Sequence, residues 1–432
     1  MTDLLEFINN TSSPFHVVKK AAEILEKNDF EELVFNKKWE LKKGHKYYTM
    51  PYRTSLYAFH VPLQTDETTG IKMVSSHTDY PCLRVKPNPE TVSNGYMKLN
   101  IEPYGGLIRN TWLDRPLSIA GIVALKSSDA LKPNRRYVDF KRPILVVPNL
   151  AIHMNRKVNE GVEINPQTQL QPILGMISEE INKDKYFMEL LAKELSVKCE
   201  DILDFDLYVY NVEKGCRAGI SEEFLSAPRL DNVSGVVAAL NGLIGALNCN
   251  KDKILDNDIK VACFYDNEEI GSRTKQGADS SLTNILINKI GNSLKMDNED
   301  IENSILNGFM LSIDVAHAVH PNYSEKSDPT NIVKINDGVV LKINTSQKYA
   351  TDTEAIAGVM QLCMDNDIPY QKFVNRADST GGGTLGTITS SWLPMKTVDL
   401  GIPLLAMHSS RELGGIKDQD ALEKLVKIFF ME

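Results

Sequence analysis

Three strongly apolar runs in this chain of 432 residues end at side chains that can bind a cation. IKMVSS precedes His77, DIKVACFY precedes Asp266, and FMLSI precedes Asp314. Nearly continuous apolar runs are typical of strands that are buried on both faces, as in parallel sheets covered by helices. Open α/β sheets place their sites beyond the carboxyl ends of such strands. The sequence therefore predicts an α/β fold with a functional site at one edge of its sheet.

Further segments carry residues of the same chemical type. Glu268 and Glu269 stand in YDNEEIGS, Asp231 stands in SAPRLDN at the start of a helix-like run, and His408 stands in LAMHSSREL. Imidazole and carboxylate together suit borderline ions such as Zn²⁺, Co²⁺ or Mn²⁺, whereas Ca²⁺ takes oxygen ligands. We predict two divalent metal ions, with Zn²⁺ favoured, and the following ligands: His77, Asp231, Glu269, Asp314 and His408.

The carboxylates in this set fit a pair of metal ions. Two neighbouring cations repel each other unless anionic ligands lie between and around them, and Asp231, Glu269 and Asp314 can meet that need. Adjacent side chains point in different directions, so Glu268 can face an attacking water as general base. Asp79 can accept the second ring N–H of His77 and fix its tautomer. The set predicts metal-assisted peptide-bond hydrolysis.

The order and wording of these segments closely resemble the aspartyl aminopeptidase and vacuolar aminopeptidase I family of di-zinc exopeptidases. The resemblance covers nearly the whole chain. It is carried by SSPFHVV (12–18), HTDYPCLRVKPNP (77–89), YGGLIRNTWLDRPLSIAG (104–121), LAIHMNR (150–156), GVVLKINTSQKYATD (338–352) and GGGTLGTITSSWLPMKTVDLGIPLLAMHSSREL (381–413).

The resemblance implies a specific role for each candidate site residue. His77 and Asp314 would complete one metal site, Glu269 and His408 the other, with Asp231 bridging. Glu268 would act as base, and the reaction would release the N-terminal residue of a peptide. This chain departs from the family pattern at Asn267, before the paired glutamates, and at Asn110, where the family often has histidine. Neither is a predicted ligand.

The chain is longer than one hydrophobic core usually supports, so we expect two domains. Residues 86–222 contain many turn signals between short β-rich runs such as RPILVV and no predicted metal ligand. We predict a mixed-sheet, three-layer catalytic domain formed by residues 1–85 and 223–432, with 86–222 as an inserted, largely β oligomerisation domain. Helices are expected at 14–35 and 177–195.

The resemblance also implies that the subunits form a tetrahedral dodecamer through the inserted domain. His153 in LAIHMNR would then reach into a neighbouring active site and help to polarise the scissile carbonyl. From the residues alone, a structural histidine in a loop is the alternative interpretation.

Substrate contacts are predicted at Lys342, Tyr349 and His317. Lys342 lies in an apolar, strand-like run, where a buried ammonium needs an anionic partner, and a substrate carboxylate could serve. A solvent-facing lysine on an edge strand, or one paired with a structural Asp, is the alternative. For Tyr349 the alternative is a core or capping role. The family includes enzymes for acidic and for neutral N-terminal residues, and we favour acidic ones slightly.

The composition of the chain argues against some classes of function. Lys plus Arg number 48 against 57 for Asp plus Glu, a net charge of −9, which argues against nucleic-acid binding. The N-terminus lacks a signal-peptide pattern, and we expect no membrane association and a cytoplasmic enzyme. Six dispersed cysteines fit reduced thiols. Two rival functions remain: a di-metal amidase or deacylase acting on small molecules, and a non-catalytic, self-assembling scaffold.

Overall fold

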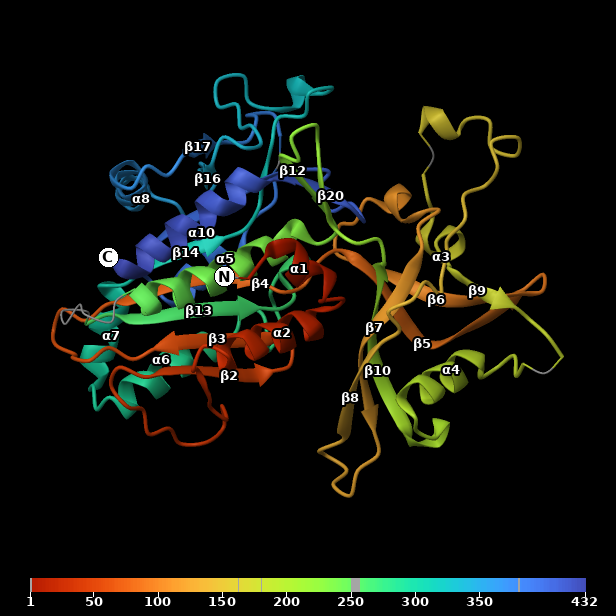
Figure 1. The fold of residues 1–432 in the computed structure, drawn as a ribbon, viewed down its shortest axis with the longest axis horizontal. Helices are drawn as coiled ribbons and strands as arrows, with labels where there is room; N and C mark the ends of the chain where they lie inside the picture. Colours follow the sequence, from red (N-terminus) through yellow and green to blue (C-terminus); the bar gives the residue numbers. More distant parts are fainter. Residues whose placement is uncertain (1, 162, 180, 250–256, 380) are drawn as a thin grey trace.

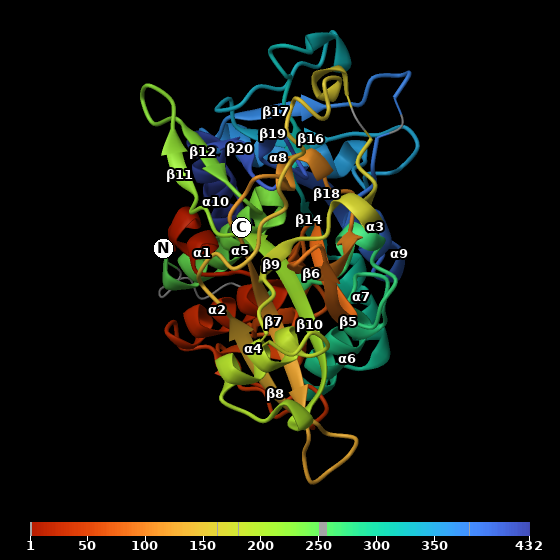
Figure 2. The same ribbon diagram turned by 90° about the vertical axis from the view of Figure 1, so that its right-hand side faces the viewer.

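The computed structural model describes residues 2–161, 163–179, 181–249, 257–379 and 381–432. Figure 1 shows a main body of helices packed on a sheet, with a second group of strands beside it. In Figure 2 the second group faces the viewer in front of the main body.

A nine-stranded mixed sheet forms the centre of the main body. In spatial order its strands are β1 (Glu31–Glu32), β2 (Lys46–Tyr52), β3 (Ser55–His60), β13 (Ile259–Tyr265), β4 (Ile71–His77), β14 (Phe309–Ile313), β18 (Lys396–Gly401), β16 (Val339–Lys342) and β17 (Tyr370–Phe373). The pairs β13–β4, β4–β14 and β14–β18 are parallel. The three strands predicted from the apolar runs are therefore confirmed and lie side by side.

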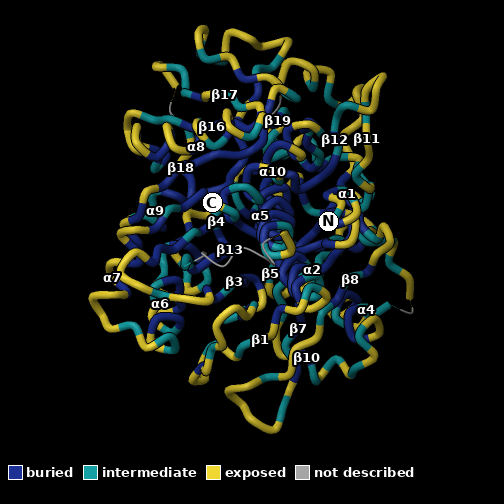
Figure 3. Tube along the Cα trace, turned by 60° about the vertical axis from the view of Figure 1, so that its left-hand side comes forward, coloured by how far each residue is buried: buried dark blue, intermediate teal, exposed yellow. Residues whose placement is uncertain are grey.

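Helices cover both faces of this sheet, which makes three layers. One face carries α1 (Leu4–Asn9), α2 (Pro14–Glu26), α5 (Leu230–Cys249), α8 (Thr353–Asp365) and α10 (Ile416–Met431). The other carries α6 (Leu282–Ser293), α7 (Asn298–Leu306) and α9 (Leu385–Trp392). Successive strand residues point to opposite faces, so Val74 packs in the first core and Met73 in the second. Figure 3 shows β4, β13 and α5 buried between exposed peripheral loops. The predicted α/β, three-layer class is confirmed.

Helix α5 is the one helix in the described part of the chain that is long and apolar enough to cross a membrane by length and composition. Its most apolar window is 83% buried within the fold. That burial is typical of a core helix, and α5 packs against α10 and β4.

An antiparallel sheet of six strands forms the second group. In spatial order they are β8 (Asn134–Asp139), β7 (Leu117–Leu125), β10 (Ile202–Asn211), β5 (Cys82–Ser93), β6 (Tyr96–Tyr104) and β9 (Ile173–Met176). Helix α4 (Tyr186–Leu195) packs on this sheet in a separate apolar core, and α3 (Pro166–Gln169) lies near β6. The proposed domain division at 86 and 222 stays a prediction; the six-stranded sheet itself spans 82–211.

A small five-stranded sheet completes the architecture. Its strands are β11 (Cys216–Ala218), β12 (Phe224–Ala227), β20 (Glu412–Gly415), β19 (Pro403–Leu405) and β15 (Ala316–His317). Short 3₁₀ turns occur at Arg109–Trp112, Val158–Glu160, Cys199–Asp201, Glu268–Ile270 and Ser324–Lys326.

Three local expectations need correction. The helix predicted at 14–35 ends at Glu26, and Asp29 follows in a left-handed conformation (φ 63°) that breaks the helical path. The helix predicted at 177–195 begins only at Tyr186. RPILVV forms isolated bridges rather than a strand, because Leu145 pairs with β7 while Val146 pairs with β9.

Candidate metal centre

Parallel pairing brings three of the candidate segments together. Tyr265 at the end of β13 lies opposite His77 at the end of β4, so the loop with the paired glutamates begins beside that histidine. On the other side of β4, Ser312 of β14 pairs with Ser75, which places Asp314 one step past the neighbouring strand end. The carboxyl ends of these strands therefore meet, as the sequence suggested.

Two other elements supply the remaining ligands. Asp231 lies at the first turn of α5 in an extended conformation (φ −80°, ψ 106°), and the regular helix begins only after Asn232. His408 lies in the loop between β19 and β20 and has a φ of 68°. Asp231 is 3% exposed, which places its carboxylate inside the fold.

Asp231 stands between two imidazoles. Nε2 of His77 lies 3.4 Å from Asp231 Oδ1, and Nε2 of His408 lies 3.3 Å from Asp231 Oδ2. A carboxylate that offers one oxygen to each side is the arrangement that a pair of cations requires.

Each side has a further carboxylate. Asp314 Oδ1 lies 3.6 Å from His77 Nε2, and Glu269 Oε2 lies 3.5 Å from His408 Nε2. In the sets His77–Asp231–Asp314 and Asp231–Glu269–His408, one ligand atom from each residue lies within 4.8 Å of the others. Both sets contain imidazole and carboxylate, the mixture that suits borderline divalent ions.

The buried polar atoms of the cluster test whether a metal fits. His77 Nε2, Asp231 Oδ1 and Glu269 Oε1 are all buried and have no hydrogen-bond partner. Buried polar atoms without hydrogen-bond partners are rare, because burial removes their hydrogen bonds to water and leaves nothing in their place. Each of the three belongs to a residue of one of the two ligand sets, so the residues fit a pair of cations.

The charges of the cluster lead to the same conclusion. Burial, together with the surrounding carboxylates, raises the pKa of Glu268 to about 8 and that of Glu269 well above its usual value. Although burial opposes its charge, the carboxylates of Asp231, Asp314 and Asp79 raise the pKa of His77 well above its ordinary range. The carboxylates of the cluster thus cannot all be ionised without bound protons or cations to balance their charge, and two divalent cations would supply that balance.

The two adjacent glutamates differ in exposure. The side chain of Glu268 is 17% exposed, whereas that of Glu269 is 4% exposed. Glu268 Oε2 also lies 4.0 Å from His77 Nε2, at the edge of the first ligand set. Glu268 and Glu269 also form a third candidate group with His77, so exposure is what distinguishes the two glutamates: Glu268 is the one nearer to solvent.

Asp79 contacts both His77 and the backbone of the paired glutamates. Nδ1 of His77 lies 3.1 Å from the backbone carbonyl oxygen of Asp79 and 3.3 Å from its carboxylate Oδ1. Either contact favours a proton on Nδ1 and leaves Nε2 free for a metal. The same carboxylate accepts hydrogen bonds from the backbone N–H groups of Glu268 (3.1 Å) and Glu269 (3.2 Å).

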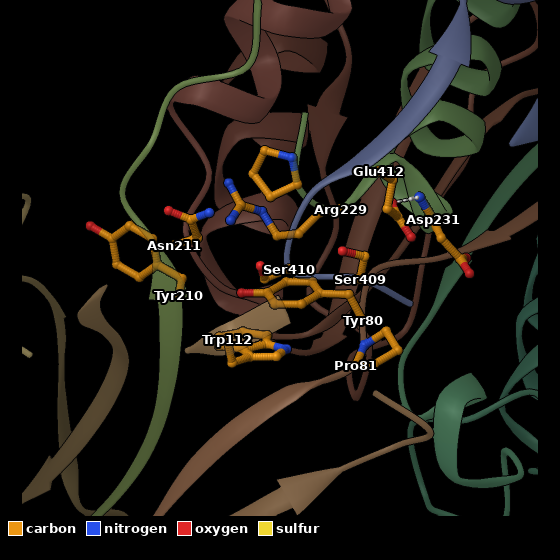
Figure 4. Close-up of a pocket in the computed structure, with 11 residues that line it drawn as sticks. Tyr80, Pro81, Trp112, Tyr210, Asn211, Arg229, Asp231, Ser409, Ser410 and Glu412 are labelled. Atoms are coloured by element: carbon orange, nitrogen blue, oxygen red, sulfur yellow. Dashed lines mark hydrogen bonds between the residues drawn. The ribbon is translucent and has the colours of Figure 1, made fainter. Parts of the chain in front are cut away.

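Sequence reasoning missed Glu412, which is buried behind the second ligand set. Its carboxylate accepts from the backbone N–H of Asp231 (3.0 Å) and from that of His408 (2.8 Å). Figure 4 shows Glu412 beside Asp231, with the first of these bonds dashed. Its position four residues after His408 is the sequence signal that could have identified it.

Tyr104 and Asn267 were not identified as supporting residues either. Tyr104 donates to Asp79 Oδ2 (2.6 Å), and Asn267 Nδ2 donates to the Tyr104 hydroxyl (2.9 Å). Burial and the facing Asp79 carboxylate hold the pKa of Tyr104 far above its usual range, so its phenol remains a donor. Tyr104 is distant in sequence from every predicted ligand, and no local pattern indicates this contact.

Lys342 is buried, at 2% exposed, on β16 between two other strands. The alternative of a solvent-facing lysine on an edge strand is therefore wrong. Its Nζ donates to the Val315 carbonyl oxygen (3.0 Å) and lies 3.5 Å from Asp314 Oδ2, so the anionic partner in the structure is a candidate metal ligand. Tyr349 is buried beside it, with its ring centroid 5.2 Å from the ammonium.

The other two predicted residues differ in their distance from the cluster. His317 is an exposed residue of β15, and partial desolvation by the surrounding protein together with the Lys342 ammonium lowers its pKa, with Asp231 and Asp314 acting in opposition. His153 is exposed on a loop, and among the described residues no hydrogen bond or ion pair connects it to the cluster.

The sequence is similar to a known family and to several known proteins. Residues 7–430 match the family described as "Aminopeptidase I zinc metalloprotease (M18)". The "Probable M18 family aminopeptidase 2" of Clostridium acetobutylicum is 47% identical over 428 residues, which covers 99% of this chain and 97% of the relative. The protein of the same name from Ectopseudomonas mendocina is 37% identical over 431 residues, with the same coverage.

This chain is also similar to solved structures. The chain is similar to one in the cryo-EM structure of the Ape4 and Nbr1 complex, with a TM-score of 0.94, 34% identity, and coverage of 99% of this chain and 85% of the other. The crystal structure of yeast aminopeptidase 1 is similar with a TM-score of 0.85 and 29% identity, and the match covers 99% of this chain and 95% of the yeast chain. The chain therefore belongs to the M18 family of zinc metallo-aminopeptidases.

Proposed function

We propose that the five ligands hold two divalent cations. His77 and Asp314 bind one, Glu269 and His408 bind the other, and Asp231 bridges them. The observation that carries this proposal is the placement of the two Asp231 oxygens opposite different imidazoles. Zn²⁺ is the favoured ion, and the same ligands would accept Co²⁺ or Mn²⁺. Two cations bound there supply Lewis-acid activation of a water and of the scissile carbonyl group.

Glu268 acts as the general base in this proposal. Its carboxylate is the more exposed of the pair and lies at the edge of the first ligand set. It takes a proton from the attacking water and later returns that proton to the leaving amine. Asp79 keeps the His77 ring in one tautomer throughout, because both of its facing oxygens accept from Nδ1.

The substrates are peptides with a free N-terminus, with acidic first residues preferred over neutral ones. Positively charged or polar groups beside the cluster support this preference: Lys342 lies within 3.5 Å of Asp314, and His317 is on the neighbouring short sheet. Tyr349 packs against Lys342 and borders the same region. Because the Lys342 ammonium is buried and paired with Asp314, it would favour an Asp or Glu substrate residue through its positive charge rather than by direct contact.

We further propose that the chain self-associates into a tetrahedral dodecamer through residues 86–222 and is a cytoplasmic enzyme. A dodecamer is the form named for S. cerevisiae mApe1, which is 28% identical to this chain with a TM-score of 0.85. The exposed position of His153, away from the cluster of its own chain, fits a contribution to a neighbouring site.

The proposal is tested with a matched peptide panel that begins with Asp, Glu, Leu or Lys, each with its amine free or acetylated. We expect chelator-sensitive release of the first residue from the free-amine peptides only, fastest for Asp or Glu. Restoring Zn²⁺ after chelation should restore the rate. Faster release of Leu would overturn the acidic preference and leave the rest intact.

Two outcomes would replace the proposal. Cleavage of the acetylated peptides would indicate the di-metal amidase or deacylase, because that enzyme tolerates a blocked amine. No cleavage with metal restored would indicate the self-assembling scaffold. Inductively coupled plasma mass spectrometry on the same samples would show whether two ions per chain are bound.

A further inference from the structure

The segment YGGLI, residues 104–108, runs from the six-stranded sheet along the back of the metal centre. β6 ends at Tyr104, which contacts Asp79 behind the first ligand set, and the following residues contact the second ligand set. The proposed mechanism does not use this segment. Its contacts nevertheless join the second group of strands to the ligands of the main body.

Tyr104 contacts the first ligand set through Asp79. The phenol is 5% exposed, donates to Asp79 Oδ2 over 2.6 Å, and accepts from Asn267 Nδ2 over 2.9 Å. The other oxygen of Asp79 lies 3.3 Å from Nδ1 of His77. A single carboxylate thus connects the phenol to the imidazole that faces the bridging Asp231.

The next residues contact the second ligand set. Gly105 has a φ of 71°, and a Cβ built there would lie 3.1 Å from the Cβ of Glu269, so the backbone passes close to that ligand. The carbonyl oxygen of Gly106 faces His408 Nδ1 at 3.1 Å, and the N–H of Ile108 donates to the His408 carbonyl oxygen at 2.9 Å. These contacts orient the His408 ring with Nε2 toward Asp231.

We propose that Tyr104 is a positioning residue which, through Asp79, fixes the His77 half of the metal centre. The six-stranded sheet therefore helps to determine how tightly the catalytic metal is held, in addition to any role in self-association. This inference rests on the proposed metal centre. Partners of ligating histidines typically change metal affinity or activity by about 10- to 100-fold when they are removed.

The test is Tyr104→Phe, with Tyr210→Phe as the matched control. Tyr210 is also a buried phenol of the six-stranded sheet that donates to a carboxylate, Asp139, over 2.7 Å, but that carboxylate belongs to β8. Zinc content is measured after dialysis against graded chelator concentrations. We expect Tyr104→Phe to lose one of its two Zn²⁺ ions at about 10- to 100-fold lower chelator strength. Tyr210→Phe should retain both, as the unsubstituted enzyme does.

Kinetics with saturating Zn²⁺ provide a second measurement. We expect Tyr104→Phe to lower kcat by about 10-fold or more while KM changes by less than about twofold, because the phenol contacts Asp79 and not the substrate. In a double-mutant cycle with Asp79→Asn, the second substitution should add little, since both act through the same carboxylate.

Several results would overturn the inference: zinc retention equal to that of Tyr210→Phe, an unchanged kcat, or effects of Tyr104→Phe and Asp79→Asn that multiply independently. Failure of the metal centre itself would look different. In that case the unsubstituted enzyme would bind no second Zn²⁺ ion and show no chelator-sensitive activity.

Discussion

At the scale of single residues, Glu268 and Glu269 are neighbours of one type for which we propose different roles. Their side chains are 17% and 4% exposed, so Glu268 is the one nearer to solvent. We predict that Glu268→Gln lowers kcat by about 10²- to 10⁴-fold, because an amide cannot accept the proton of the attacking water. Zinc content and melting temperature should match those of the parent enzyme.

The control for that prediction is Glu299→Gln on the surface of α7, which should retain full activity. If kcat of Glu268→Gln stayed near normal, Glu268 would no longer be a candidate for the base. If its zinc were lost as well, Glu268 would be reassigned as a ligand.

A second residue-scale prediction concerns His60 on β3. Burial and the nearby Lys260 and Lys46 ammonium groups lower the pKa of His60 to about 4. In the unfolded chain the pKa of His is about 6.5, so the unfolded state binds a proton more readily than the folded state. The folding stability that His60 contributes above pH 6.5 is therefore lost as the pH falls toward 4. At pH 5.5 the loss is roughly 1 kcal/mol.

The measurement is the melting temperature at pH 7.5 and pH 5.5. His60→Gln should reduce the difference between the two pH values, because glutamine does not titrate. Any loss of metal on acidification affects both proteins and cancels in the comparison. Equal differences in the two proteins would show that His60 is not a source of acid sensitivity.

Two of the candidate ligands could be predicted because imidazole and carboxylate groups are unusual at the ends of buried strands. His77 and Asp314 directly follow apolar runs, and their residue types limit what they can do there. Glu412 and Tyr104 could not be predicted in the same way. Glu412 binds backbone N–H groups, which nearly every residue offers, and Tyr104 meets Asp79 only through the tertiary fold.

At the scale of elements, α5 illustrates how closely helix and sheet are packed behind the ligands. A Cβ added at Gly235 would lie 2.6 Å from Ser76 Oγ and 2.8 Å from Ile313 Cγ2, so alanine requires the helix to move from β4 and β14. We predict that Gly235→Ala lowers stability by about 1–3 kcal/mol, measured by chemical unfolding. Zinc should also be held less tightly, because Asp231 lies at the start of this helix.

Gly245→Ala in the same helix is the matched control. A Cβ there would lie 3.3 Å from Lys427 Cδ, part of a flexible side chain that can move away. Alanine should be neutral or stabilise the helix by up to about 1 kcal/mol. Equal stability of the two variants would contradict tight packing at Gly235.

Strands were more predictable than helix boundaries for a physical reason. The runs before His77 and Asp314 are apolar on both faces because helices cover both faces of the sheet, and short runs of this kind are typical of buried strands. The helix expected at 14–35 was too long because apolar residues continue past Glu26 into the edge of the sheet. The five-stranded sheet was not foreseen, since strands as short as β15 and β19 show little periodicity.

At the scale of the whole molecule, the position of His153 connects activity to assembly. It is exposed, and among the described residues it makes no hydrogen bond or ion pair to its own candidate metal centre, so in the proposed oligomer its catalytic effect would be on another subunit. We predict that His153→Ala lowers kcat by about 10- to 100-fold, consistent with loss of a group that polarises the carbonyl. Light scattering should give the same oligomer mass as the parent enzyme. An unchanged rate would return His153 to a structural role.

The proposed ligands of the metal centre are spread from His77 to His408, and this order has a consequence during synthesis. Domains emerge from the ribosome with their N-terminal parts first, and contacts between distant residues form late. The second half of the centre closes only when the loop before β20 has been made and placed. A partly synthesised chain thus lacks the second proposed ligand set, so we expect no metal-dependent hydrolysis from it until His408 has been placed.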